Sequence, residues 1–354
     1  MSLLDRIRPD LAGFTPYASA RRTGLLAPVR LDANESPGPA AGDRAGLNRY
    51  PAPQPPALLA GLAALYGVEP DQIWAGRGSD EAIDLLVRAF CRPGQDSVVS
   101  VAPTFGMYAI AARLQGADYR TVRVGGDVGF ALDADALLAA TDADTKIVVL
   151  CSPNNPTGTV HHHLVADLAT ALAGRALLLV DEAYVEFADV ASAATLLGRH
   201  PNLAVLRTLS KAHALAGARI GCLLAAPELV RLVGAIAAPY PLPAPSVQAA
   251  LSALEDAALA ATQARVAEAI AERERLSALL PGVPGVERAW PSAGNFILIR
   301  CSDPGACFQR LLAAGVLVRD VSAQPGLAGC LRVSIGLRAE NDRLLQALGM
   351  ERAA

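Results

Sequence analysis

Short apolar runs recur along the middle of the chain and alternate with segments of helical length. They comprise residues 97–101 (SVVSV), 146–152 (KIVVLCS), 176–184 (ALLLVDEAY), 204–208 (AVLRT) and 218–226 (ARIGCLLAA). Strands that are apolar throughout are typical of parallel sheets, because helices cover both faces of such a sheet. The pattern therefore predicts an α/β fold, a three-layer sandwich with a mostly parallel central sheet.

The segment that follows a further short strand, QIWAGRG, has clear helix signals. Asp80 and Glu81 favour the positive end of a helix, and Pro93-Gly94 would stop it. Apolar residues recur at the helical spacing i, i+3, i+4 and i+7, at positions 83, 86, 87 and 90. We therefore expect a helix that opens at Ser79 directly after the glycine-rich turn GRG.

The two ends of the chain differ from its middle. The first fifty residues are rich in proline and glycine and lack periodicity, which favours an arm and loops. The last part predicts strand, helix, strand, strand and helix, a small α+β unit. The expected organisation is an N-terminal arm and part of a small domain (1–45), a large domain (46–245), a linking helix (246–280) and a small C-terminal domain (281–354).

Composition excludes several classes of function. The 354 residues are 52% hydrophobic with a net charge of -3, which predicts neither a nucleic-acid groove nor a basic membrane patch. The six cysteines form no CxxC pair and predict reduced, buried thiols. The charged N-terminus does not resemble a signal peptide, and prolines interrupt the longest uncharged stretch (232–254). We expect a cytoplasmic protein that acts on small molecules.

Lysine is scarce in this chain. Of the 31 basic residues only Lys146 and Lys211 are lysines, and the other 29 are arginines. A reaction that needs an amine able to lose its proton cannot use a guanidinium group. Lys146 begins an apolar strand, where we expect a solvated charge. Lys211 follows a strand among small residues and is the better candidate for a catalytic amine.

Four polar segments stand at predicted strand ends, where open α/β sheets bind their ligands: GRGSDE, SPNNPTG, DEAY and TLSKAHALAGAR. In this order and spacing they resemble the fold-type I aminotransferases, which use pyridoxal 5'-phosphate. Within that group, LDANESP, YPAPQP, APTFGMY, IAAPYPLPAP and CLRVSIGLR resemble the histidinol-phosphate aminotransferase family. The resemblance spans nearly the whole chain.

The resemblance implies a catalytic set and a cofactor site. Lys211 would form the Schiff base with the cofactor and shuttle the proton, and Asp181 would pair with the pyridinium nitrogen. Tyr184, the third catalytic candidate, and Asn155 would bind the phenolic oxygen of the cofactor. The phosphate would be bound by Ser79, Asp80, Thr208, Ser210 and Arg219. Phe105, where many relatives have tyrosine, would stack on the ring.

The resemblance also implies a homodimer and a substrate site. Tyr50 matches a residue that reaches the phosphate in the neighbouring subunit. Substrate recognition would fall to Tyr17, Asn34, Arg319 and Arg332. An arginine fork binds carboxylate or phosphate in bidentate fashion, so one arginine could serve both substrates of a transaminase in turn.

The histidine run invites a metal site, and we predict none. Consecutive residues 161–163 cannot converge on one ion from a regular element, so we expect a solvated loop or helix start. His213, beside Lys211, is only a candidate for a supporting role.

The function that the resemblance implies is amino transfer between L-histidinol phosphate and 2-oxoglutarate in histidine biosynthesis. Two enzymatic alternatives stay open, an aromatic amino acid aminotransferase and a threonine-phosphate decarboxylase of cobalamin synthesis, which would release carbon dioxide. A transcription regulator with an aminotransferase-like domain would need a DNA-binding module, for which the first fifty residues leave no convincing room. A non-catalytic scaffold would not need the lysine, aspartate, tyrosine and arginine set.

Overall fold

The larger part of the chain is built on one seven-stranded sheet. The structure, a computed structural model, describes residues 3–17 and 27–350. The strand order is β1-β7-β6-β5-β4-β2-β3, in which β7 runs antiparallel to β1 and β6 and the remaining pairs are parallel. The strands are β1 (Ile73–Gly76), β2 (Ser97–Ala102), β3 (Asp118–Arg123), β4 (Thr145–Cys151), β5 (Leu177–Asp181), β6 (Leu203–Thr208) and β7 (Gly221–Ala225).

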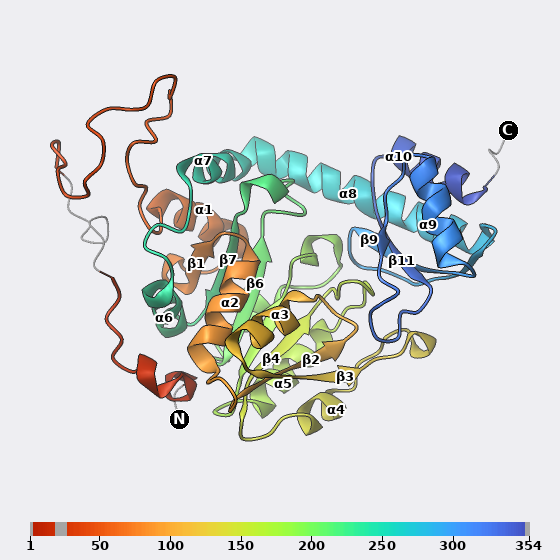
Figure 1. Cartoon of the computed structure of the whole chain (residues 1–354), viewed down its shortest axis with the longest axis horizontal. Coiled ribbons are helices and arrows are strands. Elements are labelled where there is room, and N and C mark those ends of the chain that lie inside the picture. Colours follow the sequence, from red (N-terminus) through yellow and green to blue (C-terminus); the bar gives the residue numbers. More distant parts are fainter. Residues whose placement is uncertain (1–2, 18–26, 351–354) are drawn as a thin grey trace.

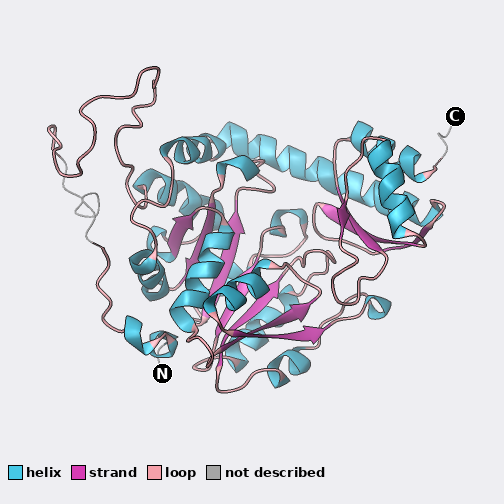
Figure 2. Cartoon of the chain, viewed as in Figure 1, coloured by secondary structure: helices cyan, strands magenta, loops and turns pink. Residues whose placement is uncertain are grey.

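Helices cover both faces of this sheet (Figures 1 and 2). Alternate strand residues face opposite sides: Val148 and Leu178 pack with α1, α4, α5 and α7, whereas Ile147 and Leu177 pack with α2, α3 and α6. The predicted three-layer sandwich is therefore confirmed. These helices are α1 (Pro56–Tyr66), α2 (Ser79–Phe90), α3 (Met107–Gln115), α4 (Ala134–Ala139), α5 (Val165–Ala171), α6 (Pro227–Ile236) and α7 (Ala244–Ala253).

A second, antiparallel sheet forms the smaller part of the molecule. Its strands, in the order β10-β11-β9-β8, are β8 (Val286–Ala289), β9 (Phe296–Cys301), β10 (Arg319–Asp320) and β11 (Cys330–Ser334). Helices α9 (Pro304–Ala313) and α10 (Arg338–Leu348) share an apolar cluster with this sheet and with the end of α8 (Asp256–Leu279). The smaller α+β unit expected from the sequence is therefore present.

The helical stretch predicted over 246–280 is two helices rather than one. Helix α7 ends at Ala253, and Glu255 has an extended backbone (ψ 146°) before α8 begins. Helix α8 then runs along the top of the molecule from the large sheet toward the small one (Figure 1). The domain boundaries themselves stay a prediction.

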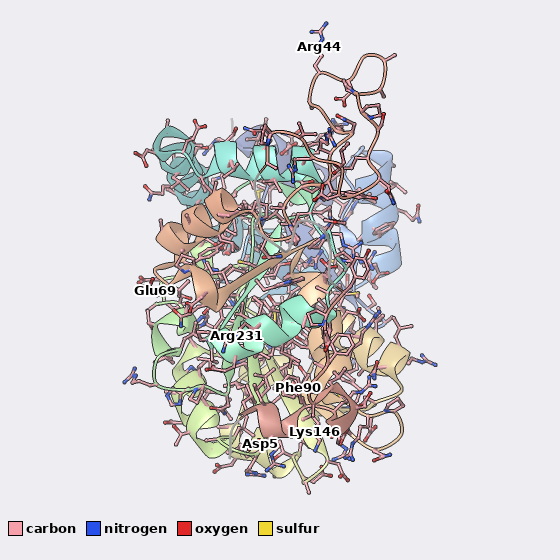
Figure 3. The ribbon with its side chains drawn as sticks, turned by 90° about the vertical axis from the view of Figure 1, so that its left-hand side faces the viewer. Asp5, Arg44, Glu69, Phe90, Lys146 and Arg231 are labelled. Carbon is pink, nitrogen blue, oxygen red and sulfur yellow. The ribbon has the colours of Figure 1, made fainter. Side chains whose placement is uncertain are left out.

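The N-terminal segment is an extended arm. Residues 27–55 loop away from α1 and α7 before the chain enters α1 (Figure 1). Arg44 projects from this arm, away from the body of the molecule (Figure 3). Among the described helices, none is both long enough and apolar enough to cross a bilayer.

Candidate active site

One cavity lies where the parallel strands β4, β5 and β6 end. Because these strands run in the same direction, the loops that follow them meet at one edge of the sheet. Most of the predicted cofactor residues contribute to the cavity wall. They are Ser79, Asp80, Phe105, Asn155, Asp181, Tyr184, Thr208, Ser210, Lys211 and Arg219, joined by Gly78, Cys151, Ala183 and Ala216.

Lys211 and Asp181 face this cavity from neighbouring strand ends. Asp181 is 2% exposed, and its burial raises the pKa of the carboxyl group to about 6. Lys211 also lines the cavity, and the residue is exposed. Partial burial and the positive charges of Arg332 and Arg219 lower its pKa. The site therefore holds an amine with a lowered pKa in the same cavity as a buried acid.

Three side chains form a polar chain that includes two residues of the cavity wall, Asn155 and Tyr184. Arg332 Nη1 donates to Asn155 Oδ1 (2.6 Å), and Asn155 Nδ2 donates to the hydroxyl of Tyr184 (3.2 Å). Arg332 comes from β11, so this contact joins the small sheet to the large one. Its Nε is buried and has no hydrogen-bond partner. An anionic group bound here would satisfy that donor.

The start of α2 forms the other side of the cavity. The first N–H groups of a helix lack partners within it and attract anions. Gly78 precedes the helix with φ +84°, and a Cβ on Gly221 would lie 2.2 Å from the amide nitrogen of Ser79. Arg219 Nη2 pairs with Asp80 Oδ2 at 3.1 Å. Glycine at 78 and 221 thus lets β7 and Arg219 approach a helix start suited to phosphate.

An aromatic pair from α3 and its preceding loop backs the site. Phe105 lines the cavity, and Tyr108 packs edge-on against it with ring centroids 5.7 Å apart. The Tyr108 hydroxyl donates to Asp181 Oδ2 (2.7 Å). The sequence interpretation missed Tyr108, because a tyrosine at a buried helical position is typical of a core residue. Its position three residues after Phe105 was the only available signal.

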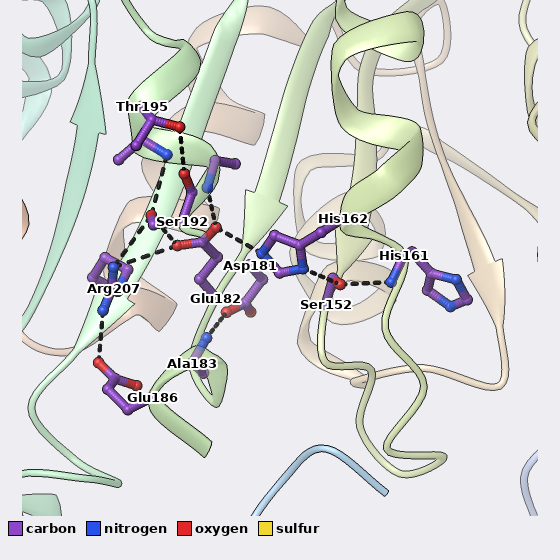
Figure 4. Close-up of polar contacts among 12 residues, drawn as sticks. Ser152, His161, His162, Asp181, Glu182, Ala183, Glu186, Ser192, Thr195 and Arg207 are labelled. Atoms are coloured by element: carbon purple, nitrogen blue, oxygen red, sulfur yellow. Dashed lines mark hydrogen bonds and ion pairs between the residues drawn. The ribbon is translucent and has the colours of Figure 1, made fainter. Parts of the chain in front are cut away.

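A second polar network lies at the ends of the same strands (Figure 4). Glu182 directly follows Asp181 and is fully buried. It accepts hydrogen bonds from the Ser192 hydroxyl (2.5 Å) and the Ala193 N–H (2.6 Å), and Arg207 Nη1 lies 3.4 Å from it. Glu182 follows the cavity residue Asp181, and Arg207 precedes the cavity residue Thr208. Successive side chains of an extended chain point to opposite sides, so Glu182 and Arg207 point away from the cavity.

The histidine run belongs to this network, which corrects the expectation of a solvated segment. His161 is 1% exposed, and its backbone N–H donates to Ser152 Oγ (2.8 Å). The His162 ring connects Ser152 Oγ (2.7 Å) with Glu182 Oε1 (2.9 Å). Only His163 is exposed. The segment is buried because it packs behind the loop that carries Asn155. In the described ranges, no set of three or more His, Cys, Asp or Glu side chains could hold a metal.

Five predicted residues do not line the cavity: Arg332, which contacts its wall through Asn155, and four that lie elsewhere. Tyr50 stacks on Tyr240 (ring centroids 4.3 Å apart), and Tyr50 and Asn34 line a separate hollow beside residues 243–245. Tyr17 is 70% exposed. Arg319 is exposed on β10, opposite Arg332 in the strand register. The chain by itself therefore does not bring Tyr17, Asn34, Tyr50 or Arg319 to the cofactor residues.

The other lysine is placed quite differently. Lys146 lies near the beginning of β4, at the end of the strand away from the cavity, and appears in the lower part of Figure 3. It is 9% exposed and pairs with Asp96 at 3.4 Å, so the expectation of a solvated charge is wrong. The carboxylate of buried Asp96 explains its burial. His213 is buried and does not line the cavity.

Comparison with known proteins identifies the family. The model of the family "Aminotransferase class I and II" matches residues 16–348. The histidinol-phosphate aminotransferase of Stenotrophomonas maltophilia (strain R551-3) is 55% identical, over 99% of this chain and 98% of that protein. The crystal structure of histidinol-phosphate aminotransferase from Sinorhizobium meliloti in complex with pyridoxal-5'-phosphate has a TM-score of 0.77 at 29% identity, over 96% of each chain.

The same fold also supports other reactions. The L-threonine-O-3-phosphate decarboxylase from Porphyromonas gingivalis has a TM-score of 0.73 at 23% identity, over 85% of this chain and 90% of that one, which shows a shared fold alone. The chain is 55% identical to the histidinol-phosphate aminotransferase over 99% of its length but 23% identical to the decarboxylase. The chain therefore belongs to the class I and II aminotransferases and, within them, to the histidinol-phosphate aminotransferase family.

Proposed function

We propose that this protein transfers the amino group of L-histidinol phosphate to 2-oxoglutarate, giving imidazole acetol phosphate and glutamate, in histidine biosynthesis. The observation that carries the proposal is that the Lys211 amine and the buried Asp181 carboxylate line one cavity. This pair occurs in a chain that is 55% identical to a histidinol-phosphate aminotransferase.

The cavity fits pyridoxal 5'-phosphate as the cofactor. The start of α2 with Thr208, Ser210 and Arg219 would bind its phosphate, as a helix N-terminus favours anions. Phe105 would stack on the ring, and Asn155 and Tyr184 would donate to the phenolic oxygen. Asp181 would accept from the ring nitrogen. When bound, this cofactor supplies an electron sink for the electrons of the substrate Cα–H bond.

Lys211 is the proposed base of the reaction. Its Nζ would remove the proton from the substrate Cα, which requires a neutral amine. Burial and the nearby Arg332 and Arg219 charges lower the pKa of the amine and so favour this state. Tyr184 has its pKa raised mainly by burial, so its hydroxyl stays a hydrogen-bond donor.

Arg332 is the proposed anchor for both substrates. Its Nε is a buried donor without a partner, and its Nη1 is oriented by Asn155. A bidentate contact could bind a carboxylate of 2-oxoglutarate in one half-reaction and the phosphate of histidinol phosphate in the other. We propose smaller contributions to substrate binding from Arg319, Tyr17 and Asn34.

We also propose a cytoplasmic homodimer in which the arm completes the neighbouring site. Large apolar side chains on the arm are well exposed, among them Leu31 at 90%, Val29 at 71% and Tyr50 at 49%. An exposed apolar segment of this kind is typical of an interface. Tyr50 would then reach the phosphate in the partner subunit, which accounts for its distance from the cavity of its own chain.

The direct test supplies purified protein with the cofactor, L-histidinol phosphate and 2-oxoglutarate, and measures glutamate. We expect one glutamate for each imidazole acetol phosphate, and no glutamate with Lys211→Ala. Comparison of kcat/KM for phenylalanine with that for histidinol phosphate separates the aromatic aminotransferase alternative. In a parallel assay with L-threonine O-3-phosphate, which has the α-carboxylate that histidinol phosphate lacks, release of carbon dioxide, together with no glutamate from histidinol phosphate, would instead identify a decarboxylase and refute the proposal.

A further inference from the structure

Tyr108 contacts the two residues that would face a bound pyridine ring. Its hydroxyl donates to Asp181 Oδ2 (2.7 Å), while the Ala183 N–H donates to Oδ1 (3.1 Å). Its ring packs edge-on against Phe105, at an interplanar angle of 83°. Tyr108 is completely buried and does not line the cavity. Any influence on a ligand must therefore pass through Asp181 or Phe105.

We propose that Tyr108 is a positioning residue for the cofactor: its hydroxyl keeps Asp181 ionised and aimed at the ring nitrogen while its ring supports Phe105. The inference rests on the proposed function, because it concerns the acid that would accept from the pyridinium N–H. Neither the family comparison nor the sequence motifs assign this role to Tyr108.

Burial disfavours the ionised form of Asp181, whereas the hydrogen bonds that it accepts favour that form. Desolvation raises the pKa of Asp181 to about 6, and the Tyr108 hydroxyl is the largest contribution that lowers it, followed by the Ala183 N–H. The pKa of Tyr108 itself is raised by burial and by the Asp181 charge, so the hydroxyl remains protonated and can donate. The other titratable groups that act on this pair are Asp80, Cys151, Glu182, Tyr184 and Lys211.

Packing alone does not explain the hydroxyl group. Tyr108 belongs to the apolar cluster between the sheet and α2, α3 and α6, where phenylalanine would fill nearly the same space. A buried hydroxyl costs free energy unless it is hydrogen-bonded. Here its partner is the buried carboxylate, so the hydroxyl satisfies the one oxygen of Asp181 that the backbone does not.

The test measures binding of a cofactor analogue to the full-length apoenzyme. The probe, 4-deoxypyridoxine 5'-phosphate, keeps the ring nitrogen and the phosphate and cannot react with lysine. Its dissociation constant is measured for wild type and Tyr108→Phe between about pH 5.5 and 8.5, on both sides of the Asp181 pKa. The probe phosphate titrates alike in both proteins, so the difference between the two curves is the readout.

The expected result is an upward shift of the pH at which binding is lost. A carboxylate that loses one donor has a higher pKa, and binding that needs the carboxylate fails as the pH falls through that value. We expect a shift of about one pH unit and about tenfold weaker binding at the acidic end, since one hydrogen bond to a charged group has roughly that effect. The curves should converge at the alkaline end.

Two further proteins serve as controls. Tyr119→Phe removes the hydroxyl of another tyrosine that packs on the same apolar cluster, and its curve should coincide with that of wild type. Incorporation of 3-fluorotyrosine at position 108 makes the hydroxyl a stronger donor, so the pH of half-binding should move down. If Tyr108 had a purely structural role, the pH of half-binding would not move up in Tyr108→Phe and down in the fluorotyrosine protein.

The possible outcomes are distinct. A folded Tyr108→Phe protein whose curve coincides with that of wild type overturns the inference. If Tyr108→Phe does not fold, the fluorotyrosine protein decides, and the absence of a downward shift overturns it. If wild type binds neither the probe nor pyridoxal phosphate, the proposed function fails first and the inference fails with it.

Discussion

At the level of one residue, the buried carboxylate of Asp181 lowers the stability of the folded apoenzyme. A carboxyl group whose pKa is raised from 3.8 to about 6 in the folded protein is held in an environment that disfavours its charge. The unfolded chain releases that proton at lower pH than the native state does. Asp181 therefore destabilises the empty fold increasingly as the pH rises from about 4 to about 6, and by a constant amount above that range.

Asp181→Asn should accordingly stabilise the apoenzyme at neutral pH. A difference of two pKa units corresponds to about 2 to 3 kcal/mol. Asn keeps the Tyr108 hydrogen bond through its carbonyl oxygen but loses the one from the Ala183 N–H, so the net gain should be about 1 to 2 kcal/mol. Urea denaturation of both apoenzymes should show this gain at pH 7 and a smaller gain as the pH falls below about 6. A less stable Asn variant at pH 7 would contradict the assignment of burial as the cause of the raised pKa.

Arg332→Lys should raise KM for both 2-oxoglutarate and histidinol phosphate. Lysine keeps the charge but loses the planar fork, so KM should increase roughly tenfold or more, the effect of one lost charged hydrogen bond. Steady-state kinetics on each substrate provide the measurement. Arg113→Lys, at an exposed position on α3, is the matched control. Unchanged KM values for Arg332→Lys would remove this residue from substrate binding.

Sequence patterns predicted some of these residues and missed others for physical reasons. Lys211 and Asp181 stand at strand ends, where a polar residue after an apolar run has few structural roles. Tyr108 and His162 are buried by segments that are distant in sequence. The local pattern of residues therefore does not indicate their burial. The role of a buried polar side chain follows from its partner, which is distant in sequence: 73 positions separate Tyr108 from Asp181.

At the level of elements, the Glu182 network joins the loops after three strands. Ser152 follows β4, Glu182 follows β5, and Arg207 lies at the end of β6. Arg207 also pairs with Glu186 (2.7 Å) and packs over the ring of Tyr66, with its guanidinium carbon 4.4 Å from the ring centroid. The network therefore holds the end of β5, which carries Asp181, and the neighbouring loops that carry Asn155 and Lys211.

Glu182→Gln should destabilise the protein and loosen the site above it. Loss of this charge weakens the hydrogen bonds that Glu182 accepts from Ser192 and the Ala193 N–H, and it leaves Glu186 as the carboxylate paired with Arg207. The cost should be about 1 to 3 kcal/mol. Urea denaturation should show that loss, and the cofactor should bind more weakly because the Asp181 loop is less well held. Glu228→Gln, which breaks an exposed pair with Arg231 (3.7 Å), should have no measurable effect. Equal effects of the two variants would contradict a role for the buried network.

Elements were predictable where their pattern was strong. The apolar strands β2, β4, β5, β6 and β7 were all expected, because burial on both faces leaves a continuous apolar run. Strands β3 and β8 were missed: β3 (DYRTVR) lies at the sheet edge with exposed and half-buried residues, and β8 has four residues. Their strand geometry depends on pairing with a neighbour more than on their own sequence.

At the level of the whole molecule, the arm extends away from the body of its own chain (Figure 1). Its apolar side chains are exposed, and Tyr50 and Asn34 lie beside a hollow separate from the cavity. The sequence predicted an arm from its proline and glycine content but could not indicate where it would lie, because an aperiodic segment has no face of its own. A second subunit would provide the surface that the arm lacks.

Subunit complementation tests this arrangement. Tyr50→Ala and Lys211→Ala should each have little activity, since each damages every site of its own homodimer. Dimers that form after mixing and reassembly should regain about a quarter of wild-type activity, because half of the dimers are hybrids and each hybrid has one intact site. If mixing restores no activity although hybrid dimers form, Tyr50 does not serve the neighbouring site.

The central claim is that Lys211 carries the cofactor, and the scarcity of lysine makes a direct test possible. The protein is incubated with pyridoxal phosphate, reduced with borohydride, digested and examined by mass spectrometry, which locates the modified amine. With only Lys146 and Lys211 in the chain, we expect the reduced cofactor on the peptide that contains Lys211 and on no other. Modification of Lys146 instead, or of neither lysine, would contradict the account.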